Sequence, residues 1–125
     1  MLDLDHFKHI NDTLGHQAGD HVLREVTHRV QSALRPYDAL GRYGGEEFVV
    51  IAPGYDHASA GTLAERLLAT VGSKPILTSG SSISVTVSIG LAFLADDSSP
   101  ELLIKRADEG LYRAKDTGRN CWRAG

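Results

Sequence analysis

The spacing of apolar residues in the first third of the chain predicts one strand followed by two helices. Residues 1–4 are typical of a short strand, and Asp5 can cap a helix over residues 6–14 that stops at Gly15. A second helix is expected over residues 20–34. Its apolar side chains recur at helical spacing and form one buried stripe of Val22, Leu23, Val26, Val30 and Leu34.

The middle of the chain predicts a β-hairpin. Pro36 ends the preceding helix, because the residue before a proline is biased away from the α region. Residues 39–43 and 47–52 then form two strands joined at Gly44 and Gly45. A two-residue turn of this kind needs positive φ angles, which glycine adopts without strain.

The last half of the chain alternates between helix and strand. An amphipathic helix over residues 60–71 ends at Gly72, and residues 83–92 alternate apolar with small or polar side chains, as a strand does. Ser99 and Pro100 begin another helix, with Leu102, Leu103, Ala107 and Leu111 on its inner face. A short strand is expected over residues 120–123. The predicted class is α/β or α+β around a largely antiparallel sheet.

Composition limits the classes of function. The chain of 125 residues is one domain, and its hydrophobic content of 42% and charged content of 23% are those of a globular protein. A net charge of −3 argues against a nucleic-acid groove or a membrane-surface domain, but it allows a small basic pocket for one polyphosphate. Cys121 is the only cysteine and there is no signal peptide or apolar span, so a cytoplasmic location is expected.

Acidic residues are placed where they would repel one another. Asp3 and Asp5 leave the first strand on the same side, and Glu46 and Glu47 lie at the hairpin tip, in R-Y-G-G-E-E-F-V-V-I. If the first strand pairs beside the hairpin, three or four carboxylates converge, and a hard cation such as Mg²⁺ would stabilise them. Alternatively, Asp5 is only a helix cap and the glutamates form a solvated turn. The spacing leaves both interpretations open.

Three segments in this order resemble one known family. D-L-D-H-F-K-H-I-N-D, G-H-Q-A-G-D and R-Y-G-G-E-E-F together are similar to the GGDEF family of diguanylate cyclases. The resemblance continues through S-I-S-V-T-V-S-I-G to K-R-A-D-E-G-L-Y-R-A-K-D-T-G-R-N, and so covers nearly the whole chain. It implies a fold like the palm of nucleotide polymerases. It also implies an enzyme that condenses two GTP molecules into cyclic di-GMP and releases pyrophosphate.

The resemblance also implies a metal site with Mg²⁺ or Mn²⁺ as cofactor. Asp3 and Glu46 match the family's metal carboxylates, and the Leu4 carbonyl matches a backbone ligand. Glu47 is an expected second carboxylate. Glu46 additionally occupies the position that takes the proton of the attacking 3′-hydroxyl.

Substrate-binding residues follow from the same resemblance. Asn11 and Asp20 match the residues that bind guanine, although both could instead cap local turns around Gly15 and Gly19. Cations and helix-start amides are expected to hold the β- and γ-phosphates, from Lys8, Lys115, Arg119 and the amides of His6 and Phe7. Without the resemblance, Lys8 and Lys115 would be assigned to solvated helix surface. Gly44 and Gly45 leave room for the nucleotide near the backbone.

R-P-Y-D, residues 35–38, resembles the family's inhibitory site for the product cyclic di-GMP. Arg35 can bind a phosphate or stack on guanine, and Asp38 can accept hydrogen bonds from the guanine edge. Arg66, on the next helix, resembles the basic residue that an adjoining domain contributes to the same ligand. The alternative is that Arg35 only stabilises a helix C-terminus, where a cation is favourable.

Two functional hypotheses remain. Family domains begin with a further helix, a loop containing D-x-L-T-G-L-x-N-R and the first half of the strand that holds Asp3. Residues 1–125 are therefore expected to be a domain lacking this start, with an upstream sensor or receiver domain in a parent protein that could be membrane-anchored. The first hypothesis is a diguanylate cyclase completed by a second copy of the domain. The second is a non-catalytic module that binds GTP or cyclic di-GMP. Under either hypothesis, residues 1–125 without the upstream region are expected to be mostly monomeric or weakly associated, with little cyclase activity.

Overall fold

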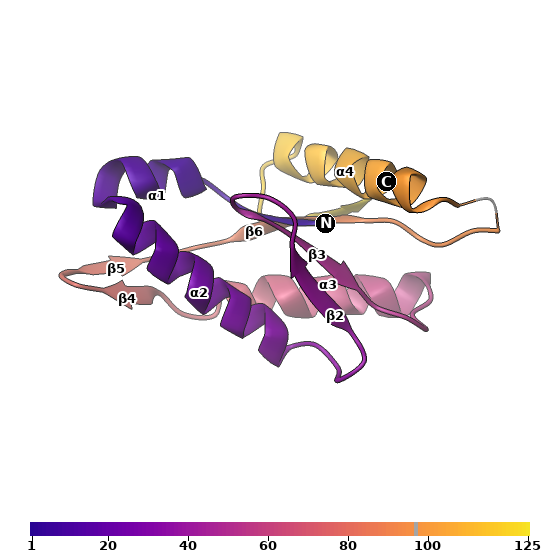
Figure 1. The fold of residues 1–125 in the computed structure, drawn as a ribbon, viewed down its shortest axis with the longest axis horizontal. Helices are drawn as coiled ribbons and strands as arrows, with labels where there is room; N and C mark the ends of the chain where they lie inside the picture. Colours follow the sequence, from indigo (N-terminus) through magenta and orange to yellow (C-terminus); the bar gives the residue numbers. More distant parts are fainter. Residues whose placement is uncertain (97) are drawn as a thin grey trace.

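The computed structural model describes residues 1–96 and 98–125, and Figure 1 shows the arrangement of their helices and strands. The elements are, in chain order, β1 (Leu2–Leu4), α1 (Phe7–Leu14), α2 (His16–Ser32), β2 (Ala39–Arg42), β3 (Glu47–Ile51), α3 (His57–Val71), β4 (Ile76–Thr78), β5 (Ser81–Ile83), β6 (Val87–Leu91), α4 (Pro100–Asp116) and β7 (Trp122–Ala124). None of these helices combines the length and the apolar character needed to cross a bilayer.

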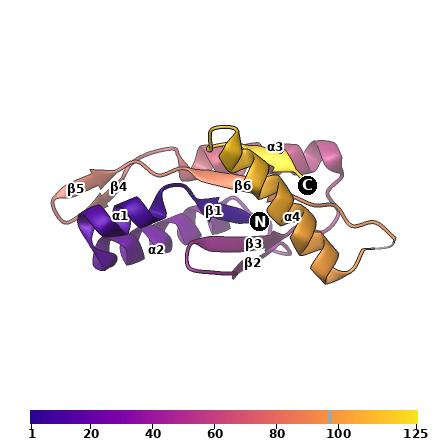
Figure 2. The same cartoon turned by 90° about the horizontal axis from the view of Figure 1, so that it is seen from above.

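The core of the fold is a five-stranded sheet in the order β2-β3-β1-β6-β7. Every neighbouring pair is antiparallel except β6 and β7, which run parallel. Strands β4 and β5 form a separate antiparallel hairpin. Helices α2 and α3 lie on one face of the sheet and α4 lies on the other, as Figures 1 and 2 show. This confirms the expected mixed class with a largely antiparallel sheet flanked by helices.

The two faces of β1 bury different kinds of side chain. Leu2 and Leu4 are each 1% exposed and pack in the main core with the apolar stripes of α2 and α3. A smaller cluster, formed by Met1, Ala107 and Leu111, lies between the sheet and α4. Because side chains alternate along a strand, Asp3 leaves β1 on the opposite face from Leu2 and Leu4.

The N-cap of α1 and the first residue of α2 differ from the predictions. Asp5 does not cap α1, because the N-cap residue is His6 and it makes no side-chain cap bond. Helix α2 begins at His16, four positions before the predicted start, so Asp20 lies within the helix. The signals at Gly15, Ser99 and Gly72 are confirmed: Gly15 ends α1 with φ of 86°, Ser99 accepts from the Leu102 amide, and Gly72 ends α3.

The hairpin that carries the two glutamates has a different turn from the predicted one. Four residues, 43–46, separate β2 from β3, and the amides of Tyr43 and Gly44 both donate to the Glu47 carbonyl. Neither Gly44 nor Gly45 has a left-handed φ, so the prediction of a two-residue turn is wrong. Gly44 instead makes room for a side chain, since a Cβ there would lie 2.7 Å from Glu47 Oε2.

The predicted long strand over residues 83–92 is divided in two. Its start belongs to β5, which pairs with β4 through a turn at Gly80, and the sheet strand β6 begins only at Val87. The final strand β7 starts at Trp122 rather than at Asn120, because Arg119 and Asn120 both have left-handed φ angles. A left-handed residue cannot continue an extended strand.

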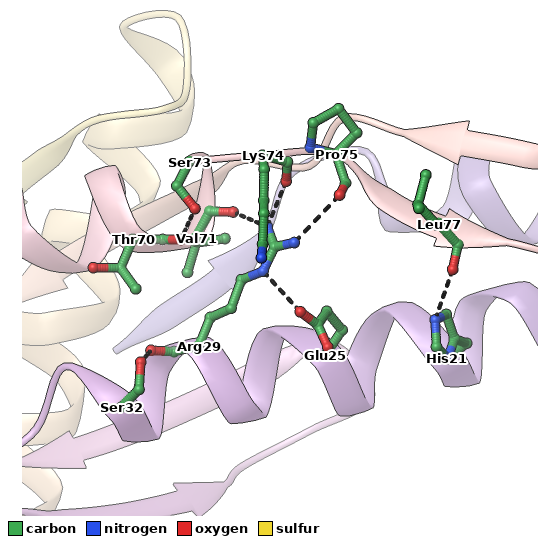
Figure 3. Close-up of polar contacts among 10 residues, drawn as sticks. All are labelled: His21, Glu25, Arg29, Ser32, Thr70, Val71, Ser73, Lys74, Pro75 and Leu77. Carbon is green, nitrogen blue, oxygen red and sulfur yellow. Dashed lines mark hydrogen bonds and ion pairs between the residues drawn. The ribbon is translucent and has the colours of Figure 1, made fainter.

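A buried arginine joins α2 to the end of α3 (Figure 3). Arg29 is 7% exposed, and its Nη1 donates to the carbonyls of Val71 and Lys74 at 2.7 and 2.6 Å. These carbonyls lie at or just after the end of α3, where helical partners are missing. Glu25 accepts from Arg29 Nε at 3.1 Å. The position of the segment from α3 to β4 is therefore fixed against α2.

Gly90 allows β6 to approach α4 closely. A Cβ at this position would overlap the Ala107 carbonyl oxygen and the Leu111 amide nitrogen, which are backbone atoms and cannot rotate away. We expect Gly90→Ala to lower the free energy of unfolding by about 3 kcal/mol, measured by urea denaturation. The matched control is Gly41→Ala in β2, where no atom lies within 4 Å of the added methyl group. Equal stability of the two variants would contradict this packing.

Candidate functional site

The register of the sheet brings Asp3 and Glu47 together. Asp3 in β1 lies directly opposite Glu47 in β3, and the neighbouring Leu4 amide donates to the Glu46 carbonyl at 3.2 Å. Side chains of directly opposed residues project from the same face of a sheet. Asp3 and Glu47 are therefore neighbours on the face covered by α4.

Lys115 reaches the same place from the last turn of α4. Its Nζ lies 3.2 Å from Asp3 Oδ1, and its side chain is 34% exposed while that of Asp3 is 6% exposed. The interpretation of Lys115 as solvated helix surface is thus wrong. A cation from one layer and an acid from the next meet at the edge of the molecule where β1 ends.

The environment of Asp3 opposes its ionisation. Burial raises the pKa of the Asp3 carboxyl from 3.8 to about 6, Lys115 works in the opposite direction, and the charges of Glu46 and Glu47 raise the pKa further. Three carboxyl groups thus act on one another electrostatically at this point. A divalent cation among them would offset the repulsion that raises the pKa of Asp3.

The donor set fits a metal that shares its coordination shell with substrate. In an antiparallel pair a residue's N–H and C=O point to the same neighbour, so the Leu4 carbonyl faces the Glu46 segment. Within residues 1–96 and 98–125, no three His, Cys, Asp or Glu side chains form a group able to hold a metal ion. Mg²⁺ usually takes one or two carboxylates and completes its shell with water and phosphate oxygens. Asp3, a glutamate and a carbonyl suit that requirement.

We expect Asp3→Asn to stabilise the fold above pH 6 by about 1–3 kcal/mol when no divalent metal is present. The folded pKa of Asp3 is about 6 and the ordinary value is 3.8. The folded state therefore binds more protons within this window, and stability falls as the pH rises through it. The advantage of the variant should vanish toward pH 4. Urea unfolding of both proteins from pH 4 to 8 measures the difference, and a less stable variant at pH 8 would contradict the raised pKa of the buried Asp3.

The two predicted guanine-binding residues lie at the contact between α1 and α2. Asn11 is half-buried in α1 and packs against Gly19, where a Cβ would overlap its Oδ1. Asp20 follows Gly19 and is exposed. Neither α1 nor α2 has a side-chain cap bond at its N-terminus, so the structure does not show the alternative capping role for these residues.

The remaining predicted phosphate-binding residues flank the end of β1. His6 and Phe7 begin α1 directly after the strand, and Lys8 is exposed in the first turn. Arg119 is exposed in the turn between α4 and β7, four residues after Lys115. Within the described part of the chain, neither Lys8 nor Arg119 forms an ion pair with an acidic side chain. Both cations could therefore bind an anion without first losing an acidic partner.

Arg35 and Asp38 form a distinct polar site after α2. Arg35 Nη2 lies 2.9 Å from Asp38 Oδ1, and this contact lowers the pKa of the Asp38 carboxyl. The guanidinium stacks 3.9 Å from the centre of the Tyr55 ring and donates to the Pro53 carbonyl at 2.6 Å. Helix α2 ends at Ser32, so Arg35 bonds the loop before α3 and not the end of its own helix.

A pocket of about 230 Å³ opens at this second site. It is lined by Gln31, Leu34, Arg35, Pro36, Asp38 and Leu40. Arg66 on α3 lies nearby, since its Nε donates to the Ala33 carbonyl at 3.1 Å and its charge also lowers the pKa of Asp38. The structure thus brings together the three residues predicted for the inhibitory site.

Comparison with known proteins identifies the family of the chain. Residues 1–121 match the family described as "Diguanylate cyclase, GGDEF domain". The chain belongs to this family. This GGDEF domain is 48% identical over 124 residues to Response regulator PleD of Caulobacter vibrioides, covering 97% of the chain and 27% of that relative. It is 45% identical over 121 residues to Diguanylate cyclase A of Treponema denticola, covering 96% of the chain and 33% of the relative.

Solved structures show the same fold. The GGDEF domain superposes on diguanylate cyclase SiaD of Pseudomonas aeruginosa, solved with its activator SiaC, with a TM-score of 0.92 and 38% identity. That match covers 96% of this chain and 46% of the other. The GGDEF domain of DgcB from Caulobacter crescentus, solved in complex with c-di-GMP, gives a TM-score of 0.91 and 37% identity, covering 96% and 72%. The chain spans a third or less of the two curated relatives named above.

Sequence reasoning missed the role of Asp5 in this GGDEF domain. Asp5 is 4% exposed, and its carboxylate accepts hydrogen bonds from the hydroxyls of Thr86 and Ser88, both at 2.7 Å. The signal was present, because Asp5 shares a strand face with Asp3 and the segment before β6 alternates hydroxyl and apolar residues. Only the pairing of β1 with β6 shows that the two patterns meet.

Proposed function

We propose that this GGDEF domain condenses two GTP molecules into cyclic di-GMP and releases two pyrophosphates, with Mg²⁺ or Mn²⁺ as cofactor. The observation that carries the proposal is the buried Asp3, opposite Glu47, near Glu46 and ion-paired with Lys115. An acidic site for a divalent cation beside a cation for phosphate is what nucleotidyl transfer requires. The names of the relatives as diguanylate cyclases support the same reaction.

Three groups of residues would bind the metal, the phosphates and the guanine of one GTP molecule. Asp3, Glu46, Glu47 and the Leu4 carbonyl would hold the metal, which stabilises charge on the α-phosphate and lowers the pKa of the attacking hydroxyl. Glu46 would accept the proton of that 3′-hydroxyl. The β- and γ-phosphates would bind Lys8, Lys115, Arg119 and the amides of His6 and Phe7. Asn11 and Asp20 would pair with guanine, and Gly44 and Gly45 would let the nucleotide approach the hairpin.

The product requires two copies of the domain. Cyclic di-GMP has two phosphodiester bonds, and each needs the 3′-hydroxyl of one nucleotide in line with the α-phosphate of the other. Two domains would therefore face each other about a two-fold axis, with one GTP in each. An upstream sensor or receiver domain of the parent protein would raise the effective concentration of one copy for the other.

We also propose that cyclic di-GMP inhibits the enzyme at the pocket formed by Arg35 and Asp38, with Arg66 contributing. The support is the stacked, bidentate arrangement of Arg35 beside a pocket large enough to admit part of a nucleotide. The c-di-GMP complex of the DgcB domain shows that a relative binds this product.

Incubation with GTP and Mg²⁺ tests the proposal directly. We expect cyclic di-GMP to appear by chromatography, and we expect chelation of the metal or replacement of GTP by ATP to abolish it. The initial rate should rise more steeply than linearly with protein concentration, because two copies must meet. GTP binding by calorimetry without product at any protein concentration would instead identify a non-catalytic binding module.

A further inference from the structure

The buried carboxylate of Asp5 connects three separate segments of the chain. Its Oδ1 accepts from Ser88 Oγ at 2.7 Å, and its Oδ2 accepts from Thr86 Oγ1 at 2.7 Å and from the Asn120 amide at 3.1 Å. Asp5 follows β1, the two hydroxyls flank the start of β6, and Asn120 lies in the turn between α4 and β7. The Asp5 amide also donates to the Thr86 carbonyl at 3.0 Å. The contacts with Thr86 and Ser88 hold Asp5 to the start of β6, and the contact with Asn120 joins it to the turn between α4 and β7.

The backbone around this carboxylate has an uncommon conformation. Among the described residues, left-handed φ angles at non-glycine positions occur at His6, Arg119 and Asn120, with values of 58°, 65° and 47°. His6 follows Asp5 directly, and Asn120 donates its amide to the Asp5 carboxylate. Such conformations persist only where surrounding contacts hold them. Asp5 supplies a contact that holds both turns.

The two turns carry residues assigned above to one triphosphate. The amides of His6 and Phe7 belong to the turn after β1, and Arg119 belongs to the turn after α4. Lys115 lies one helical turn before Arg119 and is itself held by Asp3. Asp3 and Asp5 leave the same face of β1, so they anchor neighbouring points of the segment from Lys115 to Asn120.

We propose that Asp5 is a positioning residue for the triphosphate, which ties the turn after β1 to the turn after α4 so that both face one set of phosphates. This inference rests on the proposed binding of GTP and adds a residue that touches no substrate. Without this contact, the Asn120 amide and two hydroxyls lose their acceptor. The turn that carries Arg119 then keeps its backbone bonds to Ala114 and Ile89 but loses its link to the segment that begins α1. The affinity for the phosphates should fall, and the affinity for guanine, whose proposed partners Asn11 and Asp20 lie at the contact between α1 and α2, should not.

The test compares a nonhydrolysable GTP analogue with GMP, both in the presence of Mg²⁺, by calorimetry. For Asp5→Ala we expect the affinity for the analogue to fall at least tenfold, while the affinity for GMP stays within about twofold of the unsubstituted protein. Asp5→Asn should remain within about threefold for both ligands. Its side-chain oxygen can accept from Thr86 and Asn120, and its amide can donate to Ser88 Oγ, which is able to accept.

Ser88→Ala is the matched control, because it removes a buried partner of Oδ1 and leaves both bonds to Oδ2 in place. We expect it to change the affinity for the analogue less than threefold. Equal losses for GMP and the analogue in Asp5→Ala would show a general loss of structure and overturn the positioning role. Asp5→Asn as weak as Asp5→Ala would show that the charge of Asp5, and not its bonds, matters for binding.

Hydrogen exchange at the Asn120 amide separates this inference from the proposed function. The amide should be protected in the unsubstituted protein and in Asp5→Asn, and it should exchange at least tenfold faster in Asp5→Ala. Equal protection in all three proteins would show that the Asp5 carboxylate does not hold the turn that contains Asn120. If the exchange behaves as expected and the unsubstituted protein binds no GTP, the proposed function fails and the positioning role fails with it, while the contact between the turns stands.

Discussion

Glu46→Gln is expected to lower the rate of cyclic di-GMP formation by on the order of 10³-fold, with a much smaller effect on GTP affinity. The substitution preserves the size of the side chain and removes a negative charge at the site of Asp3. Loss of a charge that stabilises the transition state more than the ground state lowers kcat, whereas the guanine and phosphate contacts elsewhere still bind GTP. Initial rates with GTP and Mg²⁺, together with calorimetric binding, measure both quantities.

A second measurement connects the result to the site. The Glu46 charge raises the pKa of Asp3, so the metal-free Glu46→Gln protein should show a lower Asp3 pKa by NMR titration. Glu109→Gln, at an exposed position on α4, is the matched control and should leave the rate and the Asp3 pKa unchanged. A Glu46→Gln protein with full activity would remove Glu46 from both the metal site and the proton transfer.

Arg35→Ala is expected to weaken cyclic di-GMP binding about tenfold to a hundredfold and to relieve product inhibition, with the initial rate on GTP unchanged. Arg35 is the cation beside the 230 Å³ pocket, and its guanidinium is already oriented by Asp38, Tyr55 and Pro53. A side chain fixed in this way loses little freedom on binding a phosphate or a guanine base. Calorimetry with cyclic di-GMP and progress curves with GTP measure the two effects.

The control for this substitution is Arg24→Ala, which removes an exposed arginine from α2 at a distance from the pocket. Removal of Arg35 also leaves the Asp38 carboxylate without its ion pair, so circular dichroism must show an unchanged fold. Identical cyclic di-GMP titrations for Arg35→Ala and the unsubstituted protein would mean that the arginine only braces the loop before α3.

The helix boundaries with a clear capping residue were predicted correctly. The stripe from Ala60 to Val71 ends at Gly72, and Ser99 with Pro100 begins α4, because caps and apolar periodicity act within a few residues. The hairpin β4–β5 was missed because each strand has only three residues, which is too short for an alternating pattern to be distinguished. The turn at Gly44 and Gly45 was wrong because neither glycine has a left-handed φ, and Gly44 instead leaves room for the Glu47 side chain.

The sequence by itself determined the types of residue in the candidate site and their order along the chain, since the acids, the cations and the glycines form motifs that resemble one family. It also determined that Asp3 and Asp5 share a strand face, because that follows from a period of two. Only the tertiary structure decided what each side chain meets. The pairing of β1 with β3 places Asp3 opposite Glu47, and the packing of α4 on the sheet places Lys115 against Asp3. The pairing of β1 with β6 places Asp5 against Ser88 and so excludes its predicted role as a helix cap. These contacts join residues more than 40 positions apart, and no local spacing encodes them.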